Sequence, residues 1–195
     1  MTNSPADSPI DAEISRIREL SKLGRHSEAL TDAEALLNRA AEQRDLLYLT
    51  AANQRCMHLV AEALETLRRL EQHHPKFSLL YQERGFCHVA LRDAPRAIDA
   101  FLRAVILNPA LAASWSMLER LYRMTGHEKN ADAAADQLTA LNQLPAEVVR
   151  AGSLFSDEDF CGAEKILRDY LGNATHAEAL RLLGRIQHQD RKSVV

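Results

Sequence analysis

The sequence predicts an all-α protein, a right-handed α-solenoid of about five helical hairpins followed by a single C-terminal helix. Three observations predict this fold. The chain of 195 residues is rich in alanine and leucine and holds only 7 glycines and 6 prolines, a composition that favours helices. No segment alternates Val, Ile or Thr with polar residues as a half-buried strand does. Small and large side chains also recur every 34 residues, a period typical of stacked helical hairpins.

Apolar residues of the chain fall in register at a period of 34 residues. One position is always small: Ala29, Ala63, Ala97 and Ala131. Other positions in register are Ala33, Leu67, Phe101 and Ala135; Leu36, Leu70, Ala104 and Leu138; and Leu47, Tyr81 and Trp115. Small residues let neighbouring helices approach, and large ones fill the space between hairpins. We therefore expect repeats at about 10–43, 44–77, 78–111 and 112–143.

The repeat at 78–111 predicts its own helix boundaries. We expect a first helix over roughly 79–91 and a second over roughly 95–107. Asp93 is a candidate N-cap, and Pro95 falls in the first helical turn, where its missing N–H removes no hydrogen bond.

Proline also predicts where second helices end. Pro75 and Pro109 are 34 residues apart, and Asn108 stands directly before the second of them. A residue before proline disfavours the helical region, so we expect the helix to end at this point.

A shortened register restarts near Leu144 and predicts a fifth hairpin over 144–176. In it Ala163, Leu167 and Tyr170 take the places of Ala97, Phe101 and Ala104. A last helix is expected over 177–189, followed by a tail at 190–195. This helix could cap the array with its polar end, or the chain could be the front part of a longer protein. Residues 1–9 are expected to be a disordered lead-in.

The residues of the best repeats resemble the tetratricopeptide repeat (TPR), whose pattern is W-x2-L-G-x2-Y, then A-x3-F-x2-A, then P. The matching residues are Tyr81, Gly85, Ala97, Phe101, Ala104, Pro109, Trp115, Leu118, Tyr122, Gly126 and Ala131. The match at 10–43 is weaker and rests mainly on Gly24, Ala29, Ala33 and Leu36. The resemblance implies a TPR array over 10–189 that acts as a non-catalytic scaffold. It also implies a protein or peptide ligand of unknown identity, held in a concave groove that the first helices line.

The resemblance further implies that non-core positions of the first helices bind the partner. The candidates are Tyr48, Ala52, Cys56, Gln82, Phe86, Met117, Arg120 and Met124. An alternative stays open for three of them, because Phe86, Met117 and Met124 have a spacing that core residues of a helix also show.

One known ligand class is not expected. TPRs that bind the C-terminal carboxylate of heat-shock chaperones use Lys and Asn one turn apart on the first such helix, and Asn, Lys and Arg on the next two. The corresponding positions here hold Tyr48 and Ala52, then Leu49 or Glu83, then Ala113 and Met117. No clamp for two carboxylates can be assembled from these residues, so we do not expect a chaperone C-terminal peptide as the partner.

The segment Leu144–Phe160, with Tyr81–Gly85 and Leu107–Trp115, resembles the N-terminal region of bacterial proteins in which TPRs precede a sulfotransferase domain. Such a domain needs a phosphosulfate-binding loop of the kind PxSG(S/T)T after a strand, and the 195 residues contain no such loop. The resemblance therefore implies an alternative function: a substrate-positioning arm whose catalytic domain is absent from this chain.

Other functions are not expected from the sequence. The motifs GxSxG, GxxxxGK(S/T), GxGxxG and HExxH are missing, so we expect no enzyme and no cofactor. The formal net charge of −3 does not favour nucleic acid or an anionic membrane as partner. No stretch approaches the ~18 apolar residues of a membrane span, and the first residues do not resemble a secretory signal.

The cysteines and histidines are expected to be structural. Cys56, Cys87 and Cys161 form no CxxC pair and predict reduced, semi-buried thiols of a cytoplasmic protein. The groups Cys56–His58, His73–His74 and Cys87–His88 fit no zinc spacing, so we expect no metal. The acidic triplet Asp157–Asp159 is expected to cap the helix that starts near Phe160.

Overall fold

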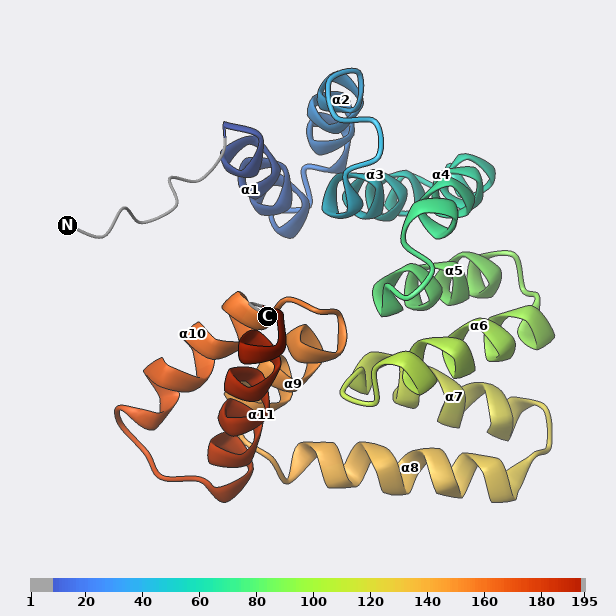
Figure 1. Ribbon diagram of the computed structural model, residues 1–195. Helices are drawn as coiled ribbons and strands as arrows, with labels where there is room; N and C mark the ends of the chain where they lie inside the picture. The colour runs from blue at the N-terminus through green and yellow to red at the C-terminus, as the bar shows by residue number, and fades with distance from the viewer. Residues whose placement is uncertain (1–8, 194–195) are drawn as a thin grey trace. The chain divides into compact units, whose positions relative to one another are not determined.

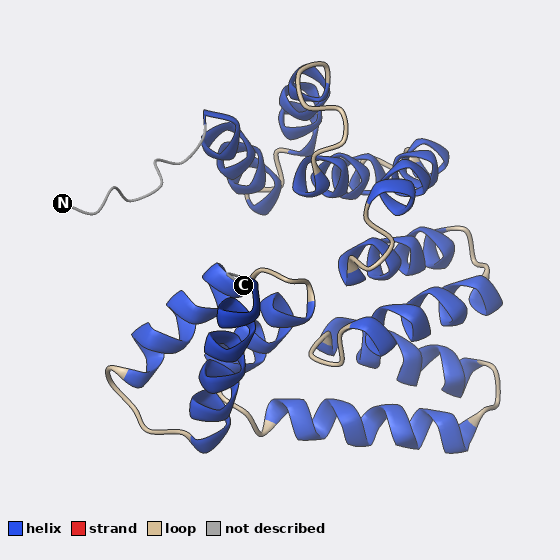
Figure 2. Cartoon of the chain, in the orientation of Figure 1, coloured by secondary structure: helices blue, strands red, loops and turns tan. Residues whose placement is uncertain are grey.

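The structure is a computed structural model that describes residues 9–193, with side chains up to Gln189 (Figure 1). Within this range the backbone forms eleven helices and no strand (Figure 2). The predicted fold class, an all-α array of helical hairpins of the α-solenoid type, is confirmed. The chain divides into two compact units, the first ending at Ala97 and the second beginning at Ile98. Each is described by itself below.

The first unit stacks two complete hairpins and the first helix of a third. Its helices are α1 (Pro9–Lys22), α2 (His26–Leu37), α3 (Arg44–Cys56), α4 (Val60–His73) and α5 (Ser78–Ala90). Each helix packs against the next in the chain, and α3 also packs against α1 and α5. Contacts between successive first helices are what joins separate hairpins into an array. The core cluster of α1–α3 consists of Ile14, Ile17, Leu20, Ala29, Ala33, Leu36, Leu46 and Leu49.

The division between the units falls within α6 (Ala94–Leu107). The second unit continues with α7 (Ala112–Met124), α8 (Glu128–Asn142), α9 (Ala146–Ser156), α10 (Phe160–Leu171) and α11 (Ala177–Ser193). Helices α7 and α8 form one hairpin, α9 and α10 the next, and α11 packs against both α9 and α10. A second core cluster joins the last three helices and consists of Val148, Ala151, Ala163, Leu167, Ala179, Leu182 and Ile186.

The sequence register matches the burial of side chains. Ala97, Phe101 and Ala104 are all fully buried on α6, as expected for a stacking face. The helices of this repeat begin and end within one residue of the predicted positions. Helix α11 continues to Ser193, four residues beyond the end expected at 189. Of the expected lead-in, residues 1–8 lie outside the described residues, and Pro9 already begins α1.

The turns inside the hairpins repeat one backbone geometry. Left-handed φ values occur, in register, at Gly24, His58, Arg92 and Gly126, and at Glu158 in the shortened hairpin. At His58, for example, the N–H donates to the Arg55 carbonyl at 2.9 Å, and the next N–H donates to the Gln54 carbonyl at 2.9 Å. This is the Schellman motif, which satisfies the last carbonyls of a helix. The same turn in every hairpin keeps the repeat length constant.

Two expected N-caps are also confirmed. The carboxylate of Asp93 accepts a hydrogen bond from the backbone N–H of Arg96 at 3.1 Å, at the start of α6. The carboxylate of Asp159 accepts one from the N–H of Gly162 at 2.9 Å, at the start of α10. Each cap pairs an N–H that the helix itself leaves without a partner.

Candidate functional site

Five of the eight predicted groove residues belong to the first unit, and all five are half-buried. Tyr48, Ala52 and Cys56 lie on α3, and Gln82 and Phe86 lie on α5. The Tyr48 ring meets the buried Phe77 ring edge-on, with 5.7 Å between the ring centres. Tyr48 therefore contributes to packing as well as to the surface.

An ion pair joins α3 to α5 beside these residues. The guanidinium of Arg55 pairs with the carboxylate of Glu83, and it also lies over the Phe86 ring, 5.3 Å from its centre. Burial raises the pKa of the Glu83 carboxyl, whereas the charge of Arg55 and its hydrogen bond act in the opposite direction. Burial, together with the charge of Glu83, raises the pKa of the Cys87 thiol to about 12. Cys87 is thus a neutral thiol at physiological pH and is unsuited to nucleophilic chemistry.

The other three predicted residues lie on α7 in the second unit. Met117 is half-buried, whereas Arg120 and Met124 are exposed. Met124 keeps 78% of its surface in solvent, so the alternative that it is a core residue is wrong. Phe86 and Met117 are half-buried, so each can both pack against neighbouring side chains and contact a partner. Participation of the eight residues in partner binding stays a prediction.

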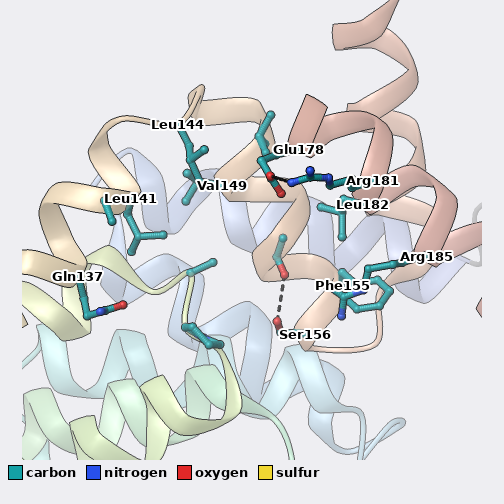
Figure 3. A pocket seen from close by; sticks show the side chains of 15 residues that line it. Gln137, Leu141, Leu144, Val149, Phe155, Ser156, Glu178, Arg181, Leu182 and Arg185 are labelled. Atoms are coloured by element: carbon teal, nitrogen blue, oxygen red, sulfur yellow. Dashed lines mark hydrogen bonds and ion pairs between the residues drawn. The ribbon is translucent and has the colours of Figure 1, made fainter. Parts of the chain in front are cut away.

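The second unit contains an open pocket of about 530 Å³ (Figure 3). Its walls come from the loop before α7, the end of α8, the helix α9 and the helix α11. The lining residues are Pro109, Ala110, Gln137, Ala140, Leu141, Leu144, Val148, Val149, Gly152, Phe155, Ser156, Glu178, Arg181, Leu182 and Arg185. The volume lies in the range of pockets that hold a small ligand or a few residues of a peptide.

Polar groups gather along the α11 side of this pocket. Glu178 and Arg181 form an ion pair with each other, visible in Figure 3. The Arg185 guanidinium lies over the ring of Phe155, 4.6 Å from its centre. Ser156 donates its hydroxyl to the Gly152 carbonyl at 3.0 Å, so its proton is already used within α9. The pocket therefore combines an apolar floor, formed by Ala140, Leu141, Leu144, Val148, Val149 and Leu182, with a cationic rim, formed by Arg181 and Arg185.

None of the eight predicted residues lines this pocket, so the sequence analysis missed it. One signal was present in the register, because α8 carries Ala135 where α6 carries the fully buried Phe101. The buried residues of α8 are the small Ala131 and Ala134, while Leu141 near its end stays half-buried. A helix that buries only alanines leaves room beside the next hairpin.

The expectation for the cysteines is wrong at one position. Cys87 is buried and Cys56 is half-buried, but Cys161 is exposed because it lies in the first turn of α10, away from the core cluster. Across residues 9–193, no group of three or more His, Cys, Asp or Glu side chains is arranged to hold a metal ion. No helix in the same range has the length and apolar character needed to cross a membrane.

Comparisons with known proteins identify similar folds. No protein-family model matches the chain, and no curated protein matches it by sequence. A TPR protein of Thermus thermophilus has a similar structure, with a TM-score of 0.62 and 24% identity, over 92% of this chain and 97% of that one. MamA from Desulfovibrio magneticus has a TM-score of 0.60 and 18% identity, over 69% of this chain and 76% of that one.

A larger assembly also contains this fold. The APC/C hetero-tetramer Cut9–Hcn1 matches with a TM-score of 0.62 and 20% identity, over 91% of this chain and 36% of the matched chain. Identities this low show the fold alone. The chain thus has the fold of TPR proteins, in agreement with the residues that resemble the repeat.

Proposed function

We propose that this chain is a non-catalytic TPR scaffold that binds a peptide or segment of a partner protein. The observation that carries the proposal is the pocket of the second unit, where apolar side chains face solvent in a concave site. Leu141, Leu144 and Val149 are only half-buried there. Fully burying one aliphatic side chain contributes roughly 1.5–3 kcal/mol, so a segment that covers this floor gains binding free energy.

The fold comparison supports the same proposal. The Cut9–Hcn1 structure is, by its name, a hetero-tetramer, so that TPR-like chain assembles with another protein. The predicted first-helix residues on α3, α5 and α7 add further surface for contacts, and four of them carry apolar side chains that stay partly exposed: Tyr48, Phe86, Met117 and Met124. We propose no cofactor and no nucleic acid or membrane partner, in line with the formal net charge of −3.

The chemistry of the pocket favours binding over catalysis. Glu178 and Arg181 neutralise each other, and the Ser156 hydroxyl is held by a backbone carbonyl. Among the lining residues there is no histidine or cysteine that could serve as base or nucleophile. Such a site can hold a ligand but has no group poised for proton transfer.

Gly152 offers a variant that fills the pocket without breaking the fold. A Cβ at this position would lie 3.9 Å from the Ala110 Cβ and 4.0 Å from a Leu182 methyl, which are ordinary contacts. Gly152→Met adds a flexible apolar side chain and raises helix propensity, whereas Gly152→Ala adds a single methyl.

The experiment is affinity purification of the full chain, expressed with a tag in the organism that encodes it, followed by mass spectrometry of the proteins recovered with it. We expect a partner whose recovery falls with Gly152→Met or with the double variant Met117→Ala and Arg120→Ala, and persists with Gly152→Ala. Circular dichroism checks that all variants stay helical. Recovery of the same proteins by every folded variant would contradict the proposal, because no predicted surface would then be involved.

The sulfotransferase-arm alternative stays a prediction from the sequence resemblance. No contact or pocket within residues 9–193 favours it. Its test is the genomic sequence after the codon for Val195, where an in-frame phosphosulfate-binding loop would support it. A cytoplasmic location likewise stays a prediction, which a fluorescent fusion of the full chain would test.

A further inference from the structure

We infer that the pocket of the second unit recognises a partner segment in which a bulky aliphatic side chain and an acidic one lie close together in sequence. The inference rests on the proposed function and assigns a ligand class to that site. It follows from three features, namely the apolar floor, the contact of Arg185 with Phe155 and the balance of charge on the rim.

The floor of the pocket selects an aliphatic side chain. It is formed by aliphatic residues from three segments: Ala140, Leu141, Leu144, Val148, Val149 and Leu182. Figure 3 shows Leu141, Leu144 and Val149 along one side of the space and Leu182 across from them. A polar side chain placed here would lose water without gaining a hydrogen bond, whereas Leu, Ile or Met would bury apolar surface.

Arg185 lies beside this floor, in contact with an aromatic ring. Its guanidinium lies over one face of the Phe155 ring, and Phe160 packs edge-on against the same ring with 5.4 Å between ring centres. Phe155 is thereby held by its neighbours on α10 and α11. A guanidinium that lies over an aromatic ring still has N–H groups available for a carboxylate.

The charge on the rim favours an acidic ligand. Of the two arginines on this side of the pocket, Arg181 is neutralised by Glu178, whereas no ion pair is formed by Arg185 among the side chains that the structure describes. Glu178 is the only acidic residue of the lining, and it is already paired. A carboxylate of the ligand would pair with Arg185, and a basic side chain would meet two guanidinium groups.

A second recess lies next to this rim on α11. Its volume is about 420 Å³, and it shares Phe155, Arg181 and Arg185 with the pocket while adding His188 from the next turn of α11. The acidic residue of the ligand is therefore expected on the α11 side, next to the aliphatic anchor, and not at the α8 end.

The test selects peptides from a phage-displayed library of random dodecapeptides on the immobilised full chain. We expect the selected peptides to carry Leu, Ile or Met with Asp or Glu within four residues on either side. The tightest peptide is then synthesised with a fluorophore, and its affinity is measured by fluorescence polarisation. Charge reversal by Arg185→Glu should weaken binding by about tenfold or more, as loss of a charge-assisted bidentate contact requires.

Arg150 supplies a matched control. It is also an exposed arginine of the second unit, but it lies on α9 and lines a separate recess with Glu147, Asp169 and Tyr170. Arg150→Glu makes the same change in net charge and should alter the affinity less than twofold. Gly152→Met should weaken binding as strongly as Arg185→Glu does. Added salt should weaken the wild-type and Arg150→Glu complexes more than it weakens the Arg185→Glu complex.

Three outcomes would overturn the inference. Peptides without acidic residues that still lose binding with Gly152→Met would refute the acidic ligand and leave the proposed function standing. An equal loss with Arg150→Glu and Arg185→Glu would show a long-range charge effect and no contact. If light scattering finds a dimer that Gly152→Met dissociates, the occupant is a second copy. The proposed function itself fails only if no peptide or partner protein loses binding when this pocket, or Met117 and Arg120 on α7, is altered.

Discussion

Removal of Arg55 tests how the two first helices α3 and α5 are joined. Glu83 retains only 4% of its side-chain exposure, and Arg55, its ion-pair partner, retains 28%. Arg55→Ala therefore leaves a buried carboxylate without a counter-charge. Loss of one partner of a fully buried pair costs about 3–5 kcal/mol, and the partial exposure of Arg55 lowers this to roughly 2–3 kcal/mol because water can enter. The melting temperature should fall by roughly 5–10 °C.

The double variant separates the buried charge from other effects of the mutation. Arg55→Ala combined with Glu83→Gln removes both charges, so much of the lost stability should return, to within about 1 kcal/mol of wild type. The exposed pair of Arg68 and Glu65 on α4 is the control, since both side chains are more than half exposed. Arg68→Ala should change the free energy of unfolding by less than about 1 kcal/mol.

The pH dependence has a defined sign. Burial already raises the folded-state pKa of Glu83, and loss of Arg55 removes the charge that opposes the rise. A carboxyl with a raised folded-state pKa gains stability as the pH falls from above that pKa towards its unfolded value. The deficit of Arg55→Ala should thus be smaller at pH 5 than at pH 7.5, as measured by urea unfolding. An equal deficit at both pH values that Glu83→Gln leaves unchanged would refute the buried-charge argument.

Two further predictions concern reactivity and turn geometry. At pH 7.5 iodoacetamide should modify the exposed Cys161 readily and leave Cys87 unmodified until the protein unfolds, because burial raises the pKa of Cys87 to about 12. Peptide mass spectrometry measures both sites, and equal rates would contradict the burial of Cys87. Glu158→Gly should raise the melting temperature by roughly 2–4 °C, since a non-glycine residue with a φ of 64° costs about 1 kcal/mol. Gly126→Ala should lower the melting temperature by a similar amount, because the φ of 77° strains a residue that has a Cβ, even though no atom lies within 4 Å of that Cβ. Unchanged melting temperatures in both variants would exclude backbone strain at these turns.

Stacking of helical hairpins was predictable from the sequence because one set of contacts repeats. A small residue followed four positions later by a large one occurs at Ala63–Leu67, Ala97–Phe101 and Ala163–Leu167. Residues four apart lie on the same face of a helix, so this spacing predicts a packing face. Local signals were equally informative, since Asp93 and Asp159 cap the helices that they precede. Only the Cys161 environment departed from expectation among these features, since one cysteine in a sequence carries no sign of which face it occupies.

The contacts between helices and the lining of the pocket were harder to predict because they do not follow the register. Arg55 and Glu83 are 28 residues apart, and Phe155 and Arg185 are 30 apart, so neither pair shares a repeat position. The rotation of α7 about its own axis also decides whether Met124 is buried or exposed, and the structure shows that it is exposed. A shift of one residue turns a side chain by about 100°, which is enough to exchange core and surface.

The helical class, the hairpin period and the residues that stack were predictable from the sequence, because they depend on the size and spacing of side chains along one chain. The position of the pocket was not predictable in this way, because it depends on how separate helices pack. The pocket exists because α8 buries only alanines while α9 and α11 pack against each other, and the guanidinium of Arg185 reaches Phe155 across that contact. Such a site depends on side chains from four separate segments, and only their packing in space brings an apolar floor and a stacked guanidinium together.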